Sequence, residues 1–208
     1  RRVGGLDLPA TNFVLIDDRG RVWITVSTLQ SPRALGYRPD GADGLGYTNE
    51  LLLSGNGKHL YVNETFGRRL TRFAVNRFGD LSDRTTVAEF GPGTFPDGLT
   101  MDVEEHFWIT SPVSNRVIRI APDGTQTLIL EDSDPEHLAW VEAAFQAGTM
   151  GREHLDAVKS RKLKNLSSLA FGGRNLRTAF LGSLQGERIG FFRAPVMGRP
   201  PVHWHFNI

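Results

Sequence analysis

The sequence predicts an all-β fold of the β-propeller type, in which small antiparallel sheets repeat around a central axis. The prediction depends on three observations. A unit of two apolar strands joined by a polar turn recurs along the chain, and the second strand of each unit is centred on an aromatic residue. Two neighbouring units also begin about 47 residues apart, which is close to the length of a propeller blade.

The copies of this unit share one order of parts, and they cover Val14–Thr28, Leu51–Thr65, Leu99–Val113 and, in a looser form, Ser168–Gly182. Their central aromatic residues are Trp23, Tyr61, Trp108 and Phe180. Turns rich in Gly, Asn and Asp separate the two strands, because these residues accept the positive φ angles of tight hairpins. A further alternating segment follows the second and third copies, so we expect three or four strands in each sheet. About four blades are therefore visible.

Two stretches depart from this repeat. The first and second copies begin only about 38 residues apart, which is short for a full blade, so we expect that a hairpin is missing near Ala42–Gly44. A helical insertion is expected at about residues 133–164. Asp134 can cap a helix that starts at Pro135, and a second short helix is expected over Arg152–Lys162. We favour packing of this insertion over a blade edge and keep a lid as the alternative.

Composition excludes several kinds of function. Lys and Arg number 24 and Asp and Glu 23, for a net charge of +1, which gives no electrostatic basis for binding nucleic acid or an anionic membrane. With 208 residues, no cysteine and no long apolar run, the chain is expected to form one soluble domain without disulfides or thiolate metal sites. The sequence leaves the oligomeric state and the compartment open, with the cytoplasm slightly favoured.

Three polar residues precede the first strand of successive units: Asn12, Asn49 and Asp97. In a propeller the innermost strands line the central channel, so side chains at their entries converge on the axis. Carboxylate and amide oxygens that meet in this way suit a hard cation such as Ca²⁺. Each residue taken alone is also an ordinary turn residue, and the repetition is what favours a site.

Several segments resemble the senescence marker protein, gluconolactonase and luciferin-regenerating enzyme family. The resemblance runs from about Ala10 to Leu184 apart from the helical insertion, and its most specific piece is Pro96-Asp97-Gly98-Leu99 followed by the strand of Trp108. It implies a six-bladed propeller with one axial divalent cation. On this basis the chain is expected to be a single propeller domain over residues 1–208 whose first blades lie outside this numbering.

The resemblance also implies roles for the three residues. Asn49 and Asp97 match metal ligands, Asp97 also matches the general base, and Asn12 matches a substrate-binding residue. The family's remaining ligand, a glutamate of the first blade, has no counterpart before Asn12. Ala10 stands where a substrate-binding Arg often precedes that Asn.

The expected function is hydrolysis of a lactone or related ester, with the cation as Lewis acid. The expected cofactor is a divalent metal, Ca²⁺ before Zn²⁺ or Mg²⁺, and the expected partner is a small-molecule substrate. Two alternatives stay open at this point. The propeller can bind a small ligand or a protein without turnover, or the metal can serve only to stabilise the blades.

Overall fold

The computed structural model describes residues 2–3, 6–7, 11–27, 44–157, 159–202 and 204. A short pair, β1 (Arg2–Val3) and β2 (Leu6–Asp7), precedes four antiparallel sheets. The expected gap near Ala42–Gly44 lies outside the described residues, which resume at Gly44. The all-β fold class is confirmed.

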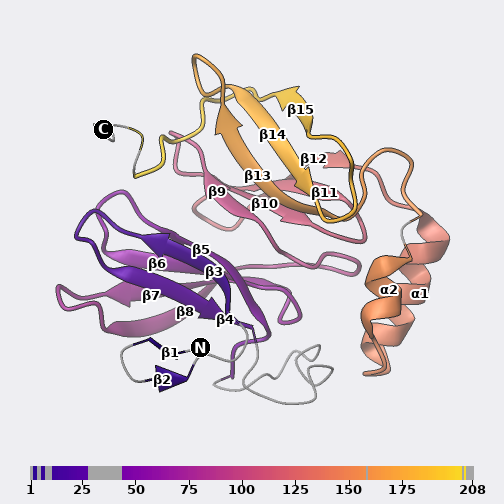
Figure 1. The fold of residues 1–208 in the computed structure, drawn as a ribbon, viewed down its shortest axis with the longest axis horizontal. Helices are drawn as coiled ribbons and strands as arrows, with labels where there is room; N and C mark the ends of the chain where they lie inside the picture. The colour runs from indigo at the N-terminus through magenta and orange to yellow at the C-terminus, as the bar shows by residue number, and fades with distance from the viewer. Residues whose placement is uncertain are drawn as a thin grey trace.

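The four sheets follow one another along the chain, and each runs outward from its first strand (Figure 1). The first sheet contains β3 (Thr11–Ile16) and β4 (Val22–Val26). The second contains β5 (Thr48–Leu53), β6 (His59–Glu64), β7 (Arg69–Val75) and β8 (Leu81–Glu89). The third contains β9 (Leu99–Met101), β10 (Phe107–Ser111), β11 (Arg116–Ile120) and β12 (Gln126–Glu131). The fourth contains β13 (Leu166–Gly172), β14 (Thr178–Ser183) and β15 (Gly190–Arg193).

The first strands of neighbouring sheets contact one another in the order β3, β5, β9 and β13, so their entries gather in one region. Three apolar layers fill the spaces between the sheets. Leu51 and Val62 pack with Leu15 between the first pair of sheets, and Leu70 packs with Ile109 between the second pair. Trp108 is fully buried against Leu169 between the third pair, which explains the aromatic residue at the centre of that unit.

The two outermost sheets of the arc keep apolar side chains on the surface. Val14, Ile16 and Val22 on the first sheet are about 60% exposed, and Phe191 on the fourth sheet is 71% exposed. Alternating strands of a propeller normally bury such faces against the next blade.

Two of the sheets close their first hairpin with the same side-chain arrangement. In the first sheet, Asp17 Oδ2 accepts hydrogen bonds from Trp23 Nε1 at 2.9 Å and Arg21 Nε at 2.6 Å. In the third sheet, Asp102 Oδ2 accepts from Trp108 Nε1 at 2.9 Å and from an arginine of the next strand at 2.8 Å. The second oxygen of each aspartate accepts backbone N–H groups of its own turn.

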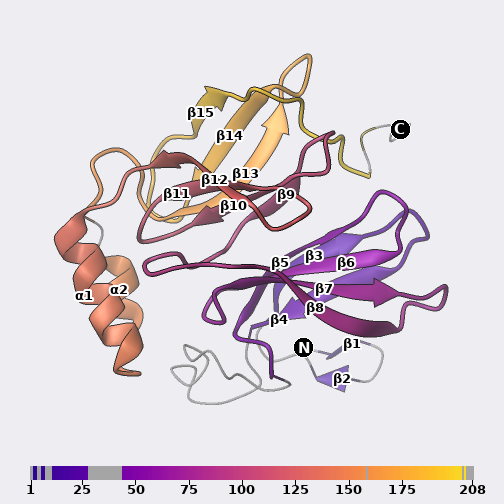
Figure 2. The ribbon, with the colours of Figure 1, turned by 180° about the vertical axis from the view of Figure 1, so that it is seen from behind.

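The helical insertion forms two helices that lie side by side at one flank of the sheets (Figures 1 and 2). Helix α1 spans Pro135–Gln146, and Asp134 caps it by accepting a hydrogen bond from the His137 N–H at 2.8 Å. Neither described helix is long and apolar enough to cross a membrane.

Helix α2 spans Arg152–Asp156 and is therefore shorter than the expected helix over Arg152–Lys162. The Asp132 carboxylate accepts the backbone N–H groups of Lys162 and Leu163 at 2.7 and 2.8 Å. These amides are therefore bound to the end of the third sheet and are not available to continue a helix.

Candidate functional site

The same irregularity occurs where the first strand of each sheet begins. In β3 the pairing with β4 shifts between Thr11 and Val14, and in β5 the pairing with β6 shifts between Thr48 and Leu51. In both strands one extra residue is inserted, which is a β-bulge. A bulge changes the alternation of side chains, so two neighbouring residues can face the same side.

The third and fourth sheets repeat the bulge. Thr110 bonds through its backbone to both Asp97 and Gly98, directly before β9, and the β13–β14 pairing shifts between Leu166 and Ser168. The residue pairs at the four bulges are Asn12-Phe13, Asn49-Glu50, Asp97-Gly98 and Ser167-Ser168.

Seven of these eight bulge residues line one cavity of about 350 Å³, and only Gly98 does not. The cavity therefore brings together all three residues singled out in the sequence: Asn12, Asn49 and Asp97. Arg152 and Leu155 of α2 complete its wall, so the insertion both packs beside the sheets and borders the site.

The backbone around Asp97 is held from both neighbouring sheets. Asn63 on β6 donates from its amide nitrogen to the carbonyl oxygens of Asp97 and Gly98, at 3.0 and 3.1 Å. Gly98 is required by close packing, since a Cβ there would lie 2.7 Å from the Ser167 carbonyl oxygen and from Thr110 Oγ1. The backbone that carries the Asp97 side chain is thus held by β6, β10 and β13.

The side chain of Asn49 is buried and oriented. Its amide nitrogen donates to Thr65 Oγ1 at 3.2 Å, and the Thr65 hydroxyl donates in turn to the carbonyl oxygen of Pro96 at 2.8 Å. Because the nitrogen is engaged, the amide oxygen is the atom left to accept a hydrogen bond or to coordinate a cation.

Glu50 is a functional candidate that the sequence reasoning missed. Its Oε2 accepts a hydrogen bond of 2.7 Å from the backbone N–H of Leu99, so the carboxylate reaches from β5 to β9. In a regular strand Glu50 would face away from Asn49, and the sequence carries no evident signal of the bulge that turns both toward the cavity. Ser167 and Ser168 were likewise not assigned to the site.

Both carboxylates have a raised pKa, and burial is the main cause in each case. Burial raises the pKa of Asp97 to about 8, and the nearby negative charge of Glu50 adds to the increase. Burial also raises the pKa of Glu50 to about 7, against the opposing effect of the Leu99 hydrogen bond. Within the described part of the chain, the Asp97 carboxylate has no hydrogen bond or ion pair that would offset the cost of its charge.

These features fit a hard divalent cation. A partly buried carboxylate without a partner is costly, and a cation lowers that cost. No group of three or more His, Cys, Asp or Glu side chains with metal-binding geometry occurs among the described residues, so a ligand set at this cavity needs neutral oxygen atoms beside the carboxylates. Asn49 can supply one such oxygen, and oxygen ligands are those that Ca²⁺ prefers.

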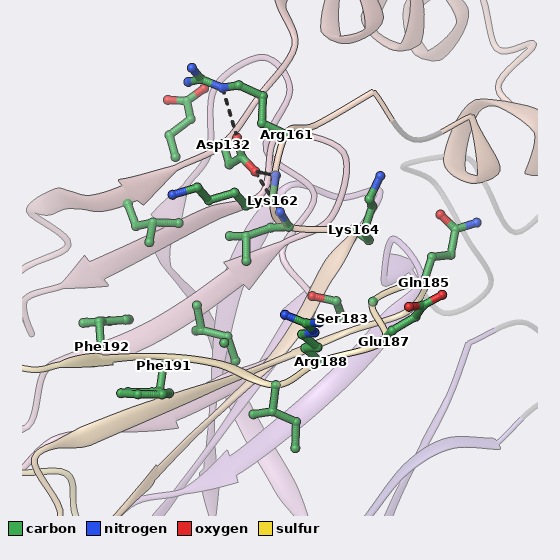
Figure 3. A pocket seen from close by; sticks show the side chains of 17 residues that line it. Asp132, Arg161, Lys162, Lys164, Ser183, Gln185, Glu187, Arg188, Phe191 and Phe192 are labelled. Atoms are coloured by element: carbon green, nitrogen blue, oxygen red, sulfur yellow. Dashed lines mark hydrogen bonds and ion pairs between the residues drawn. The ribbon is translucent and has the colours of Figure 1, made fainter.

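A larger cavity of about 960 Å³ lies between β12 and the β14–β15 hairpin (Figure 3). None of the residues singled out in the sequence lines it. One of its acidic groups, Asp132, is already engaged by the two backbone amides and by Arg161 at 3.7 Å. We therefore take the smaller cavity, with its uncompensated carboxylates, as the candidate site.

Comparison with known proteins gives a family match. The sequence profile of the SMP-30/Gluconolactonase/LRE-like region matches residues 10–132. No curated protein sequence matches the chain.

Solved structures share the fold at low sequence identity. A gluconolactonase from Xanthomonas campestris is 21% identical with a TM-score of 0.59, and the match covers 93% of this chain and 60% of that one. A luciferin-regenerating enzyme is 16% identical with a TM-score of 0.56, covering 93% of this chain and 55% of that one. The calcium-binding protein regucalcin from Agrobacterium tumefaciens is 16% identical with a TM-score of 0.52, covering 88% and 51%. The chain thus spans between half and three fifths of the length of these relatives.

Proposed function

Because the chain belongs to the SMP-30/gluconolactonase/LRE-like family, we propose that it hydrolyses a lactone or related ester with the help of a divalent cation, Ca²⁺ before Mg²⁺ or Zn²⁺. The observation that carries the proposal is the uncompensated Asp97 carboxylate, which shares one cavity with Asn49 and Asn12. A solved relative named as a gluconolactonase and another named as calcium-binding support the reaction class and the metal.

In this proposal Asn49 and Asp97 hold the cation through their side-chain oxygens. The cation supplies Lewis-acid polarisation of the substrate carbonyl group. Asn12 lies at the exposed margin of the cavity and orients the substrate by hydrogen bonding. A cavity of about 350 Å³ fits a small molecule.

Asp97 also accepts the proton of the attacking water. Two opposing effects act on its pKa: burial raises it, and a bound cation lowers it. A carboxylate whose pKa starts at about 8 can therefore bind a cation and still be a stronger base than an ordinary metal-bound aspartate.

The proposal is tested by measuring hydrolysis of a panel of sugar and alkyl lactones with Ca²⁺ and with a chelator. The wild-type chain is expected to lose activity with the chelator and regain it with added metal. Asp97→Asn is expected to reduce turnover by at least about a hundredfold, as expected for loss of a general base. Glu136→Gln, at an exposed position in the first turn of α1, serves as the matched control.

Undiminished turnover in Asp97→Asn would contradict the catalytic role. Metal binding without activity on any lactone would instead favour a cation that only stabilises the blades, and a large fall in melting temperature with chelator would accompany it.

A further inference from the structure

Glu50 lines the cavity, although in a regular strand its side chain would point to the face of the sheet opposite Asn49. The bulge in β5 leaves both Asn49 and Glu50 lining the same cavity. The corresponding second residues at the other bulges are Phe13, Gly98 and Ser168. Among the four described sheets, Glu50 is thus the one acidic residue at this repeated position, and it directly follows a candidate metal ligand.

The carboxylate of Glu50 is fixed in orientation by a neighbouring strand. Leu99, which donates its N–H to Glu50 Oε2 at 2.7 Å, lies two residues after Asp97. The other oxygen, Oε1, makes no hydrogen bond or ion pair with any residue that the structure describes. A carboxylate whose first oxygen is held by a hydrogen bond and whose second oxygen has no partner can coordinate a cation through the second oxygen.

The charges in the cavity point the same way. Glu50 and Asp97 are two acidic groups whose negative charges repel each other in a largely buried place. No Lys or Arg forms an ion pair with either carboxylate in the described residues. A divalent cation matches two carboxylates in charge, and Asn49 adds a neutral oxygen.

We propose that Glu50 is a third protein ligand of the cation, together with Asn49 and Asp97. The inference rests on the proposed function, because it requires a cation at this cavity. Glu50 differs from the first-blade glutamate that the family resemblance implies, since it comes from β5 and adjoins Asn49 in sequence. The described part of the chain then provides three oxygen ligands from two neighbouring sheets.

Calorimetric titration with Ca²⁺ alone tests this ligand. Glu50→Gln removes the charge and keeps an oxygen for the Leu99 N–H, whereas Glu50→Asp keeps the charge and shortens the side chain. Each variant is expected to bind Ca²⁺ at least about tenfold more weakly than the wild type. Mutation of residues that only hydrogen-bond to a metal ligand already lowers metal affinity by about this factor. Glu136→Gln is expected to bind like the wild type. Melting of the metal-free proteins checks that every variant is folded.

The outcomes separate this inference from the proposed function. Unchanged affinity in Glu50→Gln, together with lost affinity in Asp97→Asn, overturns Glu50 as a ligand and leaves the metal site in place. Full affinity in Glu50→Asp with loss in Glu50→Gln also overturns it, because charge alone then explains the effect. If the wild type binds neither Ca²⁺ nor, in the same titration, Mg²⁺ or Zn²⁺, both proposals fail. If the Glu50 variants weaken binding but no lactone is hydrolysed, the ligand stands and the hydrolase proposal fails.

Discussion

The carboxylate of Glu50 accepts a hydrogen bond from the backbone N–H of Leu99 at 2.7 Å, across the boundary between two sheets. Leu99 opens the strand that follows Asp97, so this bond ties the position of one acidic residue to the backbone that presents the other. The Glu50 carboxylate is therefore held in place relative to the backbone that carries Asp97.

Titration of these carboxylates is expected to make the metal-free protein less stable as pH rises. Both pKa values are raised on folding, to about 7 for Glu50 and about 8 for Asp97, from about 4 in the unfolded chain. Their contribution to the free energy of unfolding is therefore complete below about pH 4 and is lost as pH rises through 7 and 8. Urea unfolding with chelator at pH values between 5 and 9 measures this slope.

Asp97→Asn provides the control for this pH dependence, because it removes one titrating group and the repulsion on Glu50. Its unfolding free energy is expected to vary less with pH than that of the wild type. Added Ca²⁺ is expected to restore stability at high pH, where both ligands are ionised. Equal slopes in the two proteins would show that Asp97 does not have the raised pKa.

Asn63 is expected to act as a positioning residue for Asp97. Asn63→Ala removes two hydrogen bonds to the Asp97 and Gly98 carbonyl groups and should lower the free energy of unfolding by about 1–3 kcal/mol. It should also weaken Ca²⁺ binding, which a merely structural defect elsewhere would not do. Asn175→Ala, at an exposed turn, is the matched control for calorimetric titration and chemical unfolding.

Gly98→Ala is expected to destabilise the junction of the third and fourth sheets. The added Cβ would meet the Ser167 carbonyl oxygen, Ser168 Cα and Thr110 Oγ1, each at 2.7 Å. Overpacking of this kind costs about 1–3 kcal/mol, which thermal unfolding can measure. Gly91→Ala has no atom within 4 Å of its new Cβ and should melt close to wild type. Similar melting temperatures for the two variants would contradict the close contact.

Arg68 is expected to be the main polar attachment of α1. Its two guanidinium nitrogens donate to the two carboxylate oxygens of Glu142 at 2.9 and 2.6 Å, and the group stacks on Phe95 and Phe145. Arg68→Ala should cost about 3 kcal/mol, because the partly buried Glu142 carboxylate loses its ion pair and keeps only the hydrogen bonds from Gly93 and Gln146. Arg77→Ala, which removes an exposed arginine over the exposed Phe78, should cost far less.

The same ion pair gives a pH signature opposite to that of the site. The hydrogen bonds from Arg68 lower the pKa of Glu142 to about 2. Its contribution to stability is therefore present above the unfolded pKa of about 4 and is lost as pH falls toward 2. Near-UV circular dichroism between pH 5 and 2 should show this loss in wild type and not in Arg68→Ala.

Much of the fold follows from local signals in the sequence. The repeated apolar units predicted the sheets, and Asp134 with Pro135 predicted the start of α1 at the observed residue. Leu138, Val141 and Phe145 share the helix face that packs against the sheets, as their spacing indicates. These predictions are correct because each depends on residues that are close in sequence, within one helical turn or one strand.

The parts that escaped prediction depend on distant residues. Asp132, directly after β12, binds the backbone N–H groups of Lys162 and Leu163 and so holds this later segment out of a helix. The place of Glu50 is set by a bulge and by the Leu99 amide, and strand alternation alone would turn it away from Asn49. The convergence of Asn12, Asn49 and Asp97 was predictable because it follows from the repeat. Their chemical roles remain predictions.

The aspartates at the first hairpins of the first and third sheets affect how proteins built from such repeats can evolve. Asp17 and Asp102 each satisfy the polar groups of their turn, a tryptophan and an arginine from within one sheet. These hairpins therefore need no polar partner from a neighbouring sheet. A repeat that carries such a hairpin can be duplicated or lost during evolution without leaving that hairpin's own aspartate, tryptophan and arginine unpaired elsewhere in the chain.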